Sequence, residues 1–515
     1  MNWPATTANL AWVGSSLPAW SAFRRALLWP AETQWNLLRN LLANNSDCAY
    51  GRAHRFGQIR DYADFARNVP LVDYGNLIPW IDRIREGEQG GLTEARVTHL
   101  IPTSGSTGAR KLIPFTRQLQ GQFNRAISPW ITDLALRHPQ MLLGPAYWSI
   151  TPPQRTLVSE SSVIPIGFAD DASYLGGAKG QLVRTAMVIP DQLGNLDNLD
   201  EFRFRTLLCL LGERDLRLIS VWHPSFLSLL LDALPGHWEK ILAQLGQKDK
   251  RRVHDLERAN PHQPETLWPS LKVISCWGDG HAALPLAELR QHFPNVLVQA
   301  KGLLATEAFV TIPFAGSHPA AICSHFFEFV DKGGQIHRIG ELCEGGAYDV
   351  VVTTAGGLWR YHTHDEVRVT GFAGKTPTLQ FIGRNGNVSD LFGEKLAETF
   401  VADVIQRTFA LSVSKPRFAL LAPDQDATGW RYILYMEGDV PHGAAETLDR
   451  NLRQNPNYSH CRALGQLHPV EIFRITSSGY ELFVKRLVSE GKRLGDIKPV
   501  PLSCTPGWSQ TFVAN

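Results

Sequence analysis

Short apolar runs alternate with longer amphipathic stretches in the middle of the sequence, and this alternation constrains the fold most strongly. "LRLISVW" (216–222), "LKVISCWGDG" (271–280) and "NVLVQAK" (295–301) have the length and apolar content of buried strands. The helical patterns "PSFLSLLLDAL" (224–234) and "LPLAELRQHF" (284–293) separate them. Strands that alternate with helices form a mostly parallel sheet, which binds ligands at the carboxyl ends of its strands. The sequence therefore predicts an α/β fold.

The flanking regions have different patterns. Residues 20–50 indicate two helices that break at Pro30, 96–102 indicates a strand, and 117–136 indicates a helix interrupted near Pro129. Residues 103–111 are thus expected to join a strand to a helical segment. From about residue 322 the pattern is rich in strands, and beyond about residue 385 helices and strands alternate in what we expect to be a small α+β domain.

Composition excludes several classes of protein. The 515 residues are 44% hydrophobic and 19% charged, and the net charge of +2 gives no reason to expect nucleic acid or an acidic membrane as a partner. No apolar run is long enough to span a membrane, and the N-terminus lacks a signal-peptide pattern. Seven scattered cysteines without a CxxC pair argue against a disulfide framework or a zinc knuckle. We therefore expect a cytoplasmic protein.

The stretch "TSGSTGARK" (103–111) concentrates small and hydroxyl residues immediately before two cations. Small residues let backbone N–H groups converge on an anion, hydroxyls add donors, and Lys111 supplies a mobile positive charge. No glycine immediately precedes Lys111, so the stretch is not a Walker A loop. The pattern favours a phosphate-binding loop, with a solvated Ser/Gly loop as the alternative.

Two carboxylates downstream support the phosphate interpretation. Glu307 lies in the apolar run "KGLLATEAFVTIPF" (301–314), where an unpaired carboxylate is costly unless it binds a cation or a donor. Asp365 lies in "GLWRYHTHDEVRVTGF" (357–372), at an expected strand end. Taken singly, Glu307 could be a helix cap or salt-bridged, and Asp365 could pair with Arg360 or Arg368. The ordered combination of loop, Thr-Glu and Asp favours a nucleotide site.

At this point the chain resembles a known family. "TSGSTGARK", "ATE" (305–307) and "YHTHD" (361–365) followed by "FIGRNGN" (381–387) resemble, in order, the nucleotide motifs of the ANL adenylate-forming superfamily. "VPLVDYGNLIPWIDRIREGE" (69–88), "RKLIPFT" (110–116), "KGLLATE" (301–307) and "VRVTGF" (367–372) are similar to the auxin-responsive Gretchen Hagen family of acyl acid amido synthetases, in its bacterial type. The resemblance extends from about residue 35 to 500.

The resemblance implies a ligase that uses ATP to activate a carboxylic acid as acyl-AMP, releases pyrophosphate, and transfers the acyl group to an amine, most naturally an amino acid. It implies Mg²⁺ held by Glu307, and catalytic roles for Glu307, Lys111 and Lys498. The implied ATP-binding residues are Ser104, Gly105, Ser106, Thr107, Gly108, Lys111, Leu303, Thr306, Asp365, Arg384 and Lys395. Asp365 would accept the ribose hydroxyls, and Thr306 would lie near the α-phosphate.

The resemblance also implies two domains. A large N-terminal α/β domain (1–383) with layered sheets and a β-barrel-like portion would bind ATP and the acid, and a small mobile α+β domain (384–515) would follow. Arg384 would lie at the hinge and Lys395 just after it. Lys498, in "GDIKPV" (495–500), would reach the acyl carboxylate or the α-phosphate, although a solvated tail lysine is an equal alternative.

The sequence departs from the superfamily pattern at two positions. Leu303 replaces the aromatic residue four positions before the motif glutamate, and His364 replaces the glycine before the motif aspartate. The acyl pocket leaves the weakest signal. Trp148 and Trp222 are candidate wall residues, with ordinary core packing as the alternative.

Other functions share parts of these motifs. An acyl-CoA or carrier-protein thioester ligase uses the same adenylation step with a thiol acceptor, and a non-catalytic relic would bind nucleotide or acid without turnover. The expected partners are a small carboxylic acid and an amine, without nucleic acid or membrane, and the expected assembly is a monomer or a small homo-oligomer.

Overall fold

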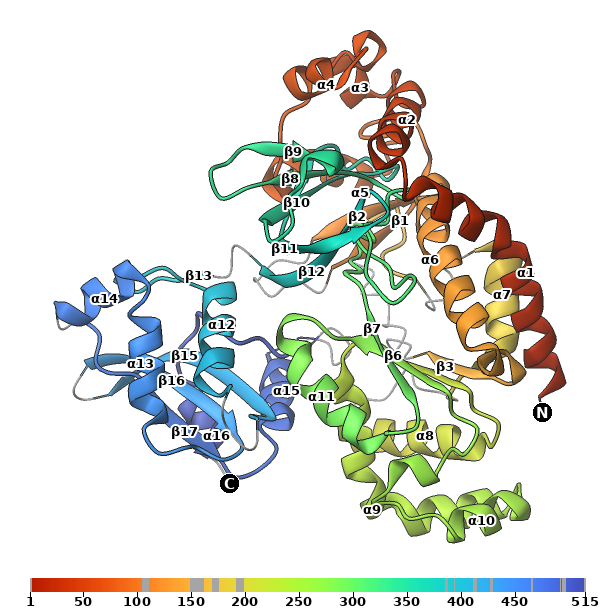
Figure 1. Cartoon of the computed structure of the whole chain (residues 1–515), viewed down its shortest axis with the longest axis vertical. Helices are drawn as coiled ribbons and strands as arrows, with labels where there is room; N and C mark the ends of the chain where they lie inside the picture. The colour runs from red at the N-terminus through yellow and green to blue at the C-terminus, as the bar shows by residue number, and fades with distance from the viewer. Residues whose placement is uncertain are drawn as a thin grey trace. The chain divides into compact units, whose positions relative to one another are not determined.

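A computed structural model describes residues 2–103, 111–148, 162–168, 176–190, 199–384, 388–392, 394–410, 415–426, 429–464, 466–490, 492 and 497–513 (Figure 1). Its mixture of helices and strands confirms the predicted α/β class. Contacts divide the chain into two compact units. The first comprises Met1–Gly278, Glu288–Thr363 and Val367–Phe381, and the second comprises Asp279–Ala287, His364–Glu366 and Ile382–Asn515. The domain boundary between residues 383 and 384 stays a prediction.

Helices precede and separate the strands of the first unit. They are α1 (Trp3–Ala26), α2 (Pro30–Ala43), α3 (Ala49–Ala53), α4 (Tyr62–Asn68), α5 (Tyr74–Arg85), α6 (Arg117–Arg137), α7 (Gly177–Ala186), α8 (Leu199–Gly212), α9 (Pro224–Gly246) and α10 (Lys250–Glu257). A further helix, α11 (Ala283–His292), begins in the second unit and ends in the first. The break at Pro30 is confirmed, because this proline begins α2, where its missing N–H costs nothing. Helices α1, α6 and α7 pack side by side (Figure 1).

A five-stranded parallel sheet lies at the centre of the predicted α/β region. Its order is β4-β3-β5-β6-β7, formed by β3 (Ala146–Trp148), β4 (Met187–Val188), β5 (Leu218–Ser220), β6 (Val273–Trp277) and β7 (Leu297–Lys301). The three strands expected from the apolar runs are therefore confirmed, each shorter than its run. Their core positions are buried because helices cover both faces of such sheets.

The segment around the small-residue loop differs from the expected strand-to-helix connection. Strand β1 (Val97–Pro102) pairs with an antiparallel strand β2 (Leu112–Thr116), and α6 begins only after β2. The sequence signal for β2 is weak because Pro114 interrupts its apolar pattern and proline is confined to edge positions in sheets. The expected interruption of α6 near Pro129 is also wrong, since the helix continues through this residue.

The strand-rich region forms an open five-stranded sheet instead of a barrel. Its order is β12-β11-β10-β8-β9, formed by β8 (Phe326–Val330), β9 (Ile336–Arg338), β10 (Ala347–Thr353), β11 (Tyr361–Ala373) and β12 (Thr376–Arg384). Strands β12 and β9 are its two edges, so the described strands close no barrel. Short strands with charged residues, such as β9, are usual at an exposed edge.

The second unit contains a three-stranded sheet with apolar clusters on both faces. Its order is β15-β16-β17, and the unit comprises β13 (Val388–Ser389), β14 (Leu396–Ala397), β15 (Phe418–Asp426), β16 (Gly429–Glu437), β17 (Glu471–Ile475), α12 (Glu398–Thr408), α13 (Ala444–Leu452), α14 (Pro456–Ala463), α15 (Gly479–Ser489) and α16 (Ser509–Val513). Alternate residues of β15 belong to different clusters: Leu421 packs with α12–α14, and Leu420 packs with α15 and α16. The expected alternation of helices and strands is confirmed.

None of the helices in the described ranges is both long and apolar enough to cross a membrane.

A buried ion pair connects the antiparallel sheet to the helices before it. The guanidinium of Arg360 is 2% exposed and donates to both carboxylate oxygens of Glu328, with its Nη2 2.8 Å from Glu328 Oε1. Its Nη1 donates to the carbonyls of Ala66 and Val69, and the Tyr62 hydroxyl donates to Glu328 at 2.6 Å. The pair thereby fixes the end of α4 against the sheet.

Removing one charge from this pair should destabilise the protein strongly. We expect Glu328→Gln to lower the free energy of unfolding by about 3–5 kcal/mol, because it leaves the Arg360 guanidinium buried without a counter-charge. Urea denaturation followed by tryptophan fluorescence measures the change. The matched control is Glu341→Gln in the exposed Arg338–Glu341 pair, for which the expected loss is at most about 1 kcal/mol. Equal losses in the two variants would contradict the structural role of the buried pair.

Candidate active site

The hairpin of β1 and β2 holds the ends of the predicted phosphate loop. Ser104, Gly105, Ser106, Thr107 and Gly108 lie outside the described residues. The strands on either side are paired up to the loop, because the Thr103 N–H donates to the carbonyl of Lys111 at 2.9 Å. Lys111 therefore emerges at the open end of a two-stranded hairpin.

Lys111 lies between two tyrosines. Its Nζ donates to the hydroxyl of Tyr361 at 3.1 Å. The same atom is 5.7 Å from the ring centre of Tyr74 and 5.8 Å from that of Tyr361, distances at which an ammonium is attracted to an aromatic face. Tyr361 begins β11, the strand that carries the predicted ribose-binding Asp365. The first and third predicted motifs are thus joined by a direct contact.

Tyr74 connects Lys111 to the second motif. Its hydroxyl accepts from the N–H of Leu112 at 2.6 Å, which places the ring beside the start of β2. Burial raises the pKa of the Tyr74 phenol, and the negative charge of nearby Glu307 adds to the rise. Tyr74 is thus packed by Lys111 and lies within electrostatic range of Glu307.

Thr306 and Glu307 occupy a tight turn. Leu304 and Phe309 form an isolated antiparallel bridge, and the N–H of Ala305 donates to the carbonyl of Ala308 at 3.0 Å. The turn leaves the Glu307 residue only 6% exposed. Its carboxylate has no hydrogen-bond or ion-pair partner among the residues that the structure describes. A buried, unpaired carboxylate fits a hard divalent cation such as Mg²⁺, which prefers oxygen ligands.

The residues before this turn are closely packed. A Cβ at Gly302 would collide with the backbone and hydroxyl of Thr311, so only glycine fits there. The N–H of Leu303 donates to the Thr311 hydroxyl at 2.7 Å, and its side chain packs on the main core. Where the superfamily has an aromatic residue, this chain therefore has a half-buried aliphatic one.

His364 has a backbone conformation that favours glycine, the residue of the superfamily pattern at this position. Its φ is +64°, in the left-handed region that costs an L-residue about 1–2 kcal/mol. Asp365 follows it within β11. Of the two ion-pair partners considered for Asp365, Arg360 directs its guanidinium to Glu328. Asp365 as a ribose acceptor stays a prediction.

Three side chains gather at the carboxyl ends of β5, β6 and β7. Lys301, 5% exposed at the end of β7, donates from Nζ to the carbonyl of Val221 at 2.8 Å and lies 4.8 Å from the ring centre of Trp222. Trp277, at the end of β6, packs edge-on against Trp222 with ring centres 5.9 Å apart. This is the sheet edge at which α/β proteins bind ligands. The role of Trp222 as a pocket residue stays a prediction, and its position is compatible with that role.

Trp148 lies at the end of β3 and packs against Trp12 of α1, with ring centres 6.0 Å apart. Both rings line an apolar cavity of about 20 Å³, which has room for roughly one water molecule. This cavity is too small for an acid substrate. The role of Trp148 in an acyl pocket stays a prediction.

In the second unit, the segment of Lys395 is held by its neighbours. Glu394 is buried and accepts from the N–H groups of Leu391 and Phe392, and from the Tyr432 hydroxyl at 2.5 Å. Lys395 has a φ of +44°, and its carbonyl accepts from Asn455 at 3.2 Å.

The other two predicted site residues of this region lie at or next to the limits of described ranges. Arg384 ends β12, at the limit of a described range. Lys498 is half-buried next to Ile497, whose carbonyl accepts from Tyr480. The hinge role of Arg384 and the catalytic role of Lys498 stay predictions.

Four residues of these groups were missed by sequence reasoning. Tyr361, Lys301 and Tyr74 lie in stretches that carry the family resemblance, but the sequence assigned no role to them or to Trp277. Only the positions of Lys301 and Trp277, at the ends of predicted strands, could have marked them.

The contrast between two buried glutamates is testable. We expect Glu307→Gln to change the free energy of unfolding without ligand by less than about 1 kcal/mol, because the variant breaks no hydrogen bond or ion pair within the described chain. Urea denaturation measures it, with Glu328→Gln as the buried glutamate that has partners. A loss as large as that of Glu328→Gln would show that Glu307 is a structural residue.

The chain is similar to known proteins along most of its length. The chain matches the GH3 family N-terminal domain over residues 20–255, the GH3 family central domain over 319–384 and the GH3 family C-terminal domain over 399–506. It is 23% identical to indole-3-acetic acid-amido synthetase GH3.15 of Arabidopsis thaliana, over 79% of this chain and 77% of that protein.

Solved structures show the same fold. The structure of the AtGH3.15 acyl acid amido synthetase in complex with 2,4-DB matches with a TM-score of 0.84 at 19% identity, over 96% of this chain and 95% of that one. A 2-hydroxyisobutyryl-CoA ligase in the postadenylation state, in complex with R3-HIB-AMP, matches with a TM-score of 0.51 at 13% identity, over 89% and 87% of the two chains. The predicted adenylate-forming fold is thus confirmed, and the three family domains together cover most of the sequence: the chain belongs to the GH3 family.

Proposed function

We propose that this protein is an ATP-dependent acid–amine ligase. It converts a carboxylic acid to an acyl-AMP and then joins the acyl group to an amine, most naturally an amino acid. The observation that carries the proposal is the position of Lys111, whose ammonium lies by the ring of Tyr74 and donates to the hydroxyl of Tyr361, the first residue of the strand that contains Asp365. Membership in a family that includes named amido synthetases supports it.

In the first half-reaction, a carboxylate oxygen of the acid attacks the α-phosphorus of ATP, and the bond to pyrophosphate breaks. Negative charge accumulates on the phosphate oxygens, where the Lys111 ammonium and donors of the loop Ser104–Gly108 would stabilise it. Glu307 would hold Mg²⁺, which neutralises phosphate charge when bound. Thr306 would lie near the α-phosphate, and Asp365 would accept the ribose hydroxyls.

In the second half-reaction, the amine nitrogen attacks the acyl carbon, the bond to AMP breaks, and the nitrogen loses a proton. We infer that the segment of residues 384–515, with its hinge at Arg384, moves between the two half-reactions. Lys395 and Lys498 would serve the adenylation arrangement. Trp222, beside Lys301 and Trp277, would form one wall of the acid pocket.

A thioester ligase is the second candidate. The fold shared with a 2-hydroxyisobutyryl-CoA ligase favours it, because both reactions proceed through an acyl-AMP. The family match favours the amine acceptor.

The adenylation step can be tested by ATP–pyrophosphate exchange with a panel of carboxylic acids. We expect exchange with at least one acid, and a decrease of about 100-fold or more for Lys111→Met, because the variant removes a charge at the site of developing phosphate charge. Glu307→Gln should lose the Mg²⁺-dependent exchange. The matched control is Lys375→Met, which removes another lysine that lies over an aromatic ring, that of Trp29, and should keep full exchange. No exchange with any acid would favour a non-catalytic relic.

The acceptor is identified by the product. With the acid found by exchange, we expect mass spectrometry to detect an amide when an amino-acid mixture is supplied. Coenzyme A should give no comparable thioester. Formation of thioester alone would refute the amine ligase and establish the second candidate.

A further inference from the structure

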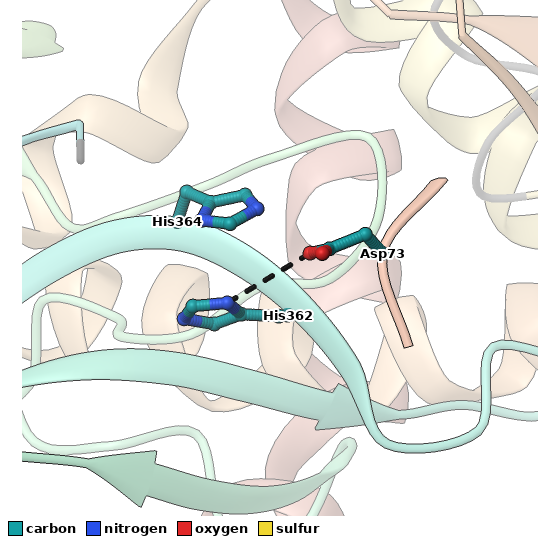
Figure 2. A group of neighbouring side chains, drawn as sticks. All are labelled: Asp73, His362 and His364. Carbon is teal, nitrogen blue, oxygen red and sulfur yellow. Dashed lines mark ion pairs between the residues drawn. The ribbon is translucent and has the colours of Figure 1, made fainter. Parts of the chain in front are cut away.

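We propose that Asp73, His362 and His364 bind a divalent transition-metal ion of the zinc class, at a site that the proposed ligase reaction does not use. Each side chain offers one ligand atom, and the three atoms lie within 4.8 Å of one another. Figure 2 shows the Asp73 carboxylate beside both imidazole rings. Two imidazole nitrogens and one carboxylate oxygen are ligands that zinc-class ions prefer.

The backbone places all three residues. The N–H of Val72 donates to the carbonyl of Arg360 at 3.1 Å, and the N–H of His362 donates to the carbonyl of Val72 at 2.9 Å. This parallel bridge positions Asp73, the next residue, beside β11. His362 and His364 are two positions apart in the same strand, and Figure 2 shows the imidazole rings of both beside Asp73.

A fourth side chain orients one of the ligands. His362 Nε2 lies 3.2 Å from Asp349 Oδ2. On its other side, His362 Nδ1 lies 3.8 Å from Asp73 Oδ1, the pair marked by the dashed line in Figure 2. If Nε2 carries the proton and donates it to Asp349, Nδ1 presents its lone pair toward Asp73. Histidines that bind metals almost always donate their other N–H in this way, most often to a carboxylate or a carbonyl. Asp349 is therefore a positioning residue.

A small ion would draw the three ligand atoms, which lie within 4.8 Å of one another, closer together. Two ligands of a tetrahedral zinc ion with bonds of about 2.1 Å lie about 3.4 Å apart. The Asp73 and His362 atoms are 3.8 Å apart, and the Asp73 side chain is 61% exposed, so it can approach without disturbing the core. Three protein ligands leave a fourth position for water. The site differs in kind from Glu307, which offers a single hard oxygen donor group.

His364 is the ligand whose position departs from the superfamily pattern, which has glycine there. Glycine would fit its left-handed backbone better and would bring no ligand. His364→Gly is therefore a favourable test variant, because it removes the imidazole while relieving the backbone. Urea denaturation of the variant checks that a loss of metal binding does not come from unfolding.

The test is a titration of the untagged full-length protein with Co²⁺, without nucleotide, followed by the visible absorption of the bound ion and by displacement with Zn²⁺. We expect one equivalent to bind and Zn²⁺ to displace it. His364→Gly should weaken binding at least about 100-fold. Asp349→Asn should weaken it about 10–100-fold, as expected for a residue that acts through a ligand.

The matched control is His337→Ala, which breaks a similar His–Asp pair at 2.9 Å that has no second histidine. This variant should bind Co²⁺ like the unmodified protein. Failure to bind one equivalent, or unchanged binding in His364→Gly, would overturn the proposal. Either result would leave the exchange assay, and hence the ligase function, unaffected.

Discussion

The attachment of residues 66–74 to strand β11 is the constraint on which the candidate site depends. Two backbone hydrogen bonds join Val72 to the strand, and the buried guanidinium of Arg360 holds the carbonyls at the end of α4 while it pairs with Glu328. Tyr74 follows directly and is therefore fixed beside the start of β2, where its hydroxyl binds the backbone next to Lys111. A segment without any catalytic motif thus positions the cation that the proposed chemistry requires. Removing either partner leaves the other charge buried and uncompensated, which makes this attachment sensitive to a single charge change.

Backbone strain accumulates at the same places. Of the five described non-glycine residues with positive φ, three lie in or beside a motif connected with nucleotide binding or with the predicted hinge: Arg360, His364 and Lys395. Such conformations cost roughly 1–3 kcal/mol each and persist only where surrounding contacts fix them. Those contacts are evident for two of the three. The side chain of Arg360 is held by Glu328 and two carbonyls, and Lys395 follows Glu394, which binds two N–H groups and the Tyr432 hydroxyl.

The sequence predicted the elements whose signals are local and missed the ones that depend on distant partners. Strands β5, β6 and β7 were predictable because unbroken apolar runs are typical of parallel strands buried on both faces. Strand β2 was not, because Pro114 weakens its pattern and only pairing with β1 makes it a strand. Glu307 stood out as a carboxylate in an apolar run, whereas Tyr74 and Tyr361 are ordinary core-type tyrosines until the fold places Lys111 between them. Lys301 could be located at a strand end, but its contact with Trp222 required the register of the sheet.

The departure at His364 illustrates how one substitution can keep a backbone and change its chemistry. A glycine at this position would adopt a φ of +64° without cost, so the histidine gains nothing from the conformation itself. What it adds is an imidazole two residues from His362, whose other ring nitrogen already faces Asp349. The carboxylate of Asp73 is delivered to the same place by the Val72 bridge. An ion bound by these three groups would tie the segment before α5 to β11 by side chains as well as by backbone, immediately before Asp365. The free energy of ion binding would then offset the cost of the strained backbone at His364. The same ion would strengthen the attachment of residues 66–74 to β11.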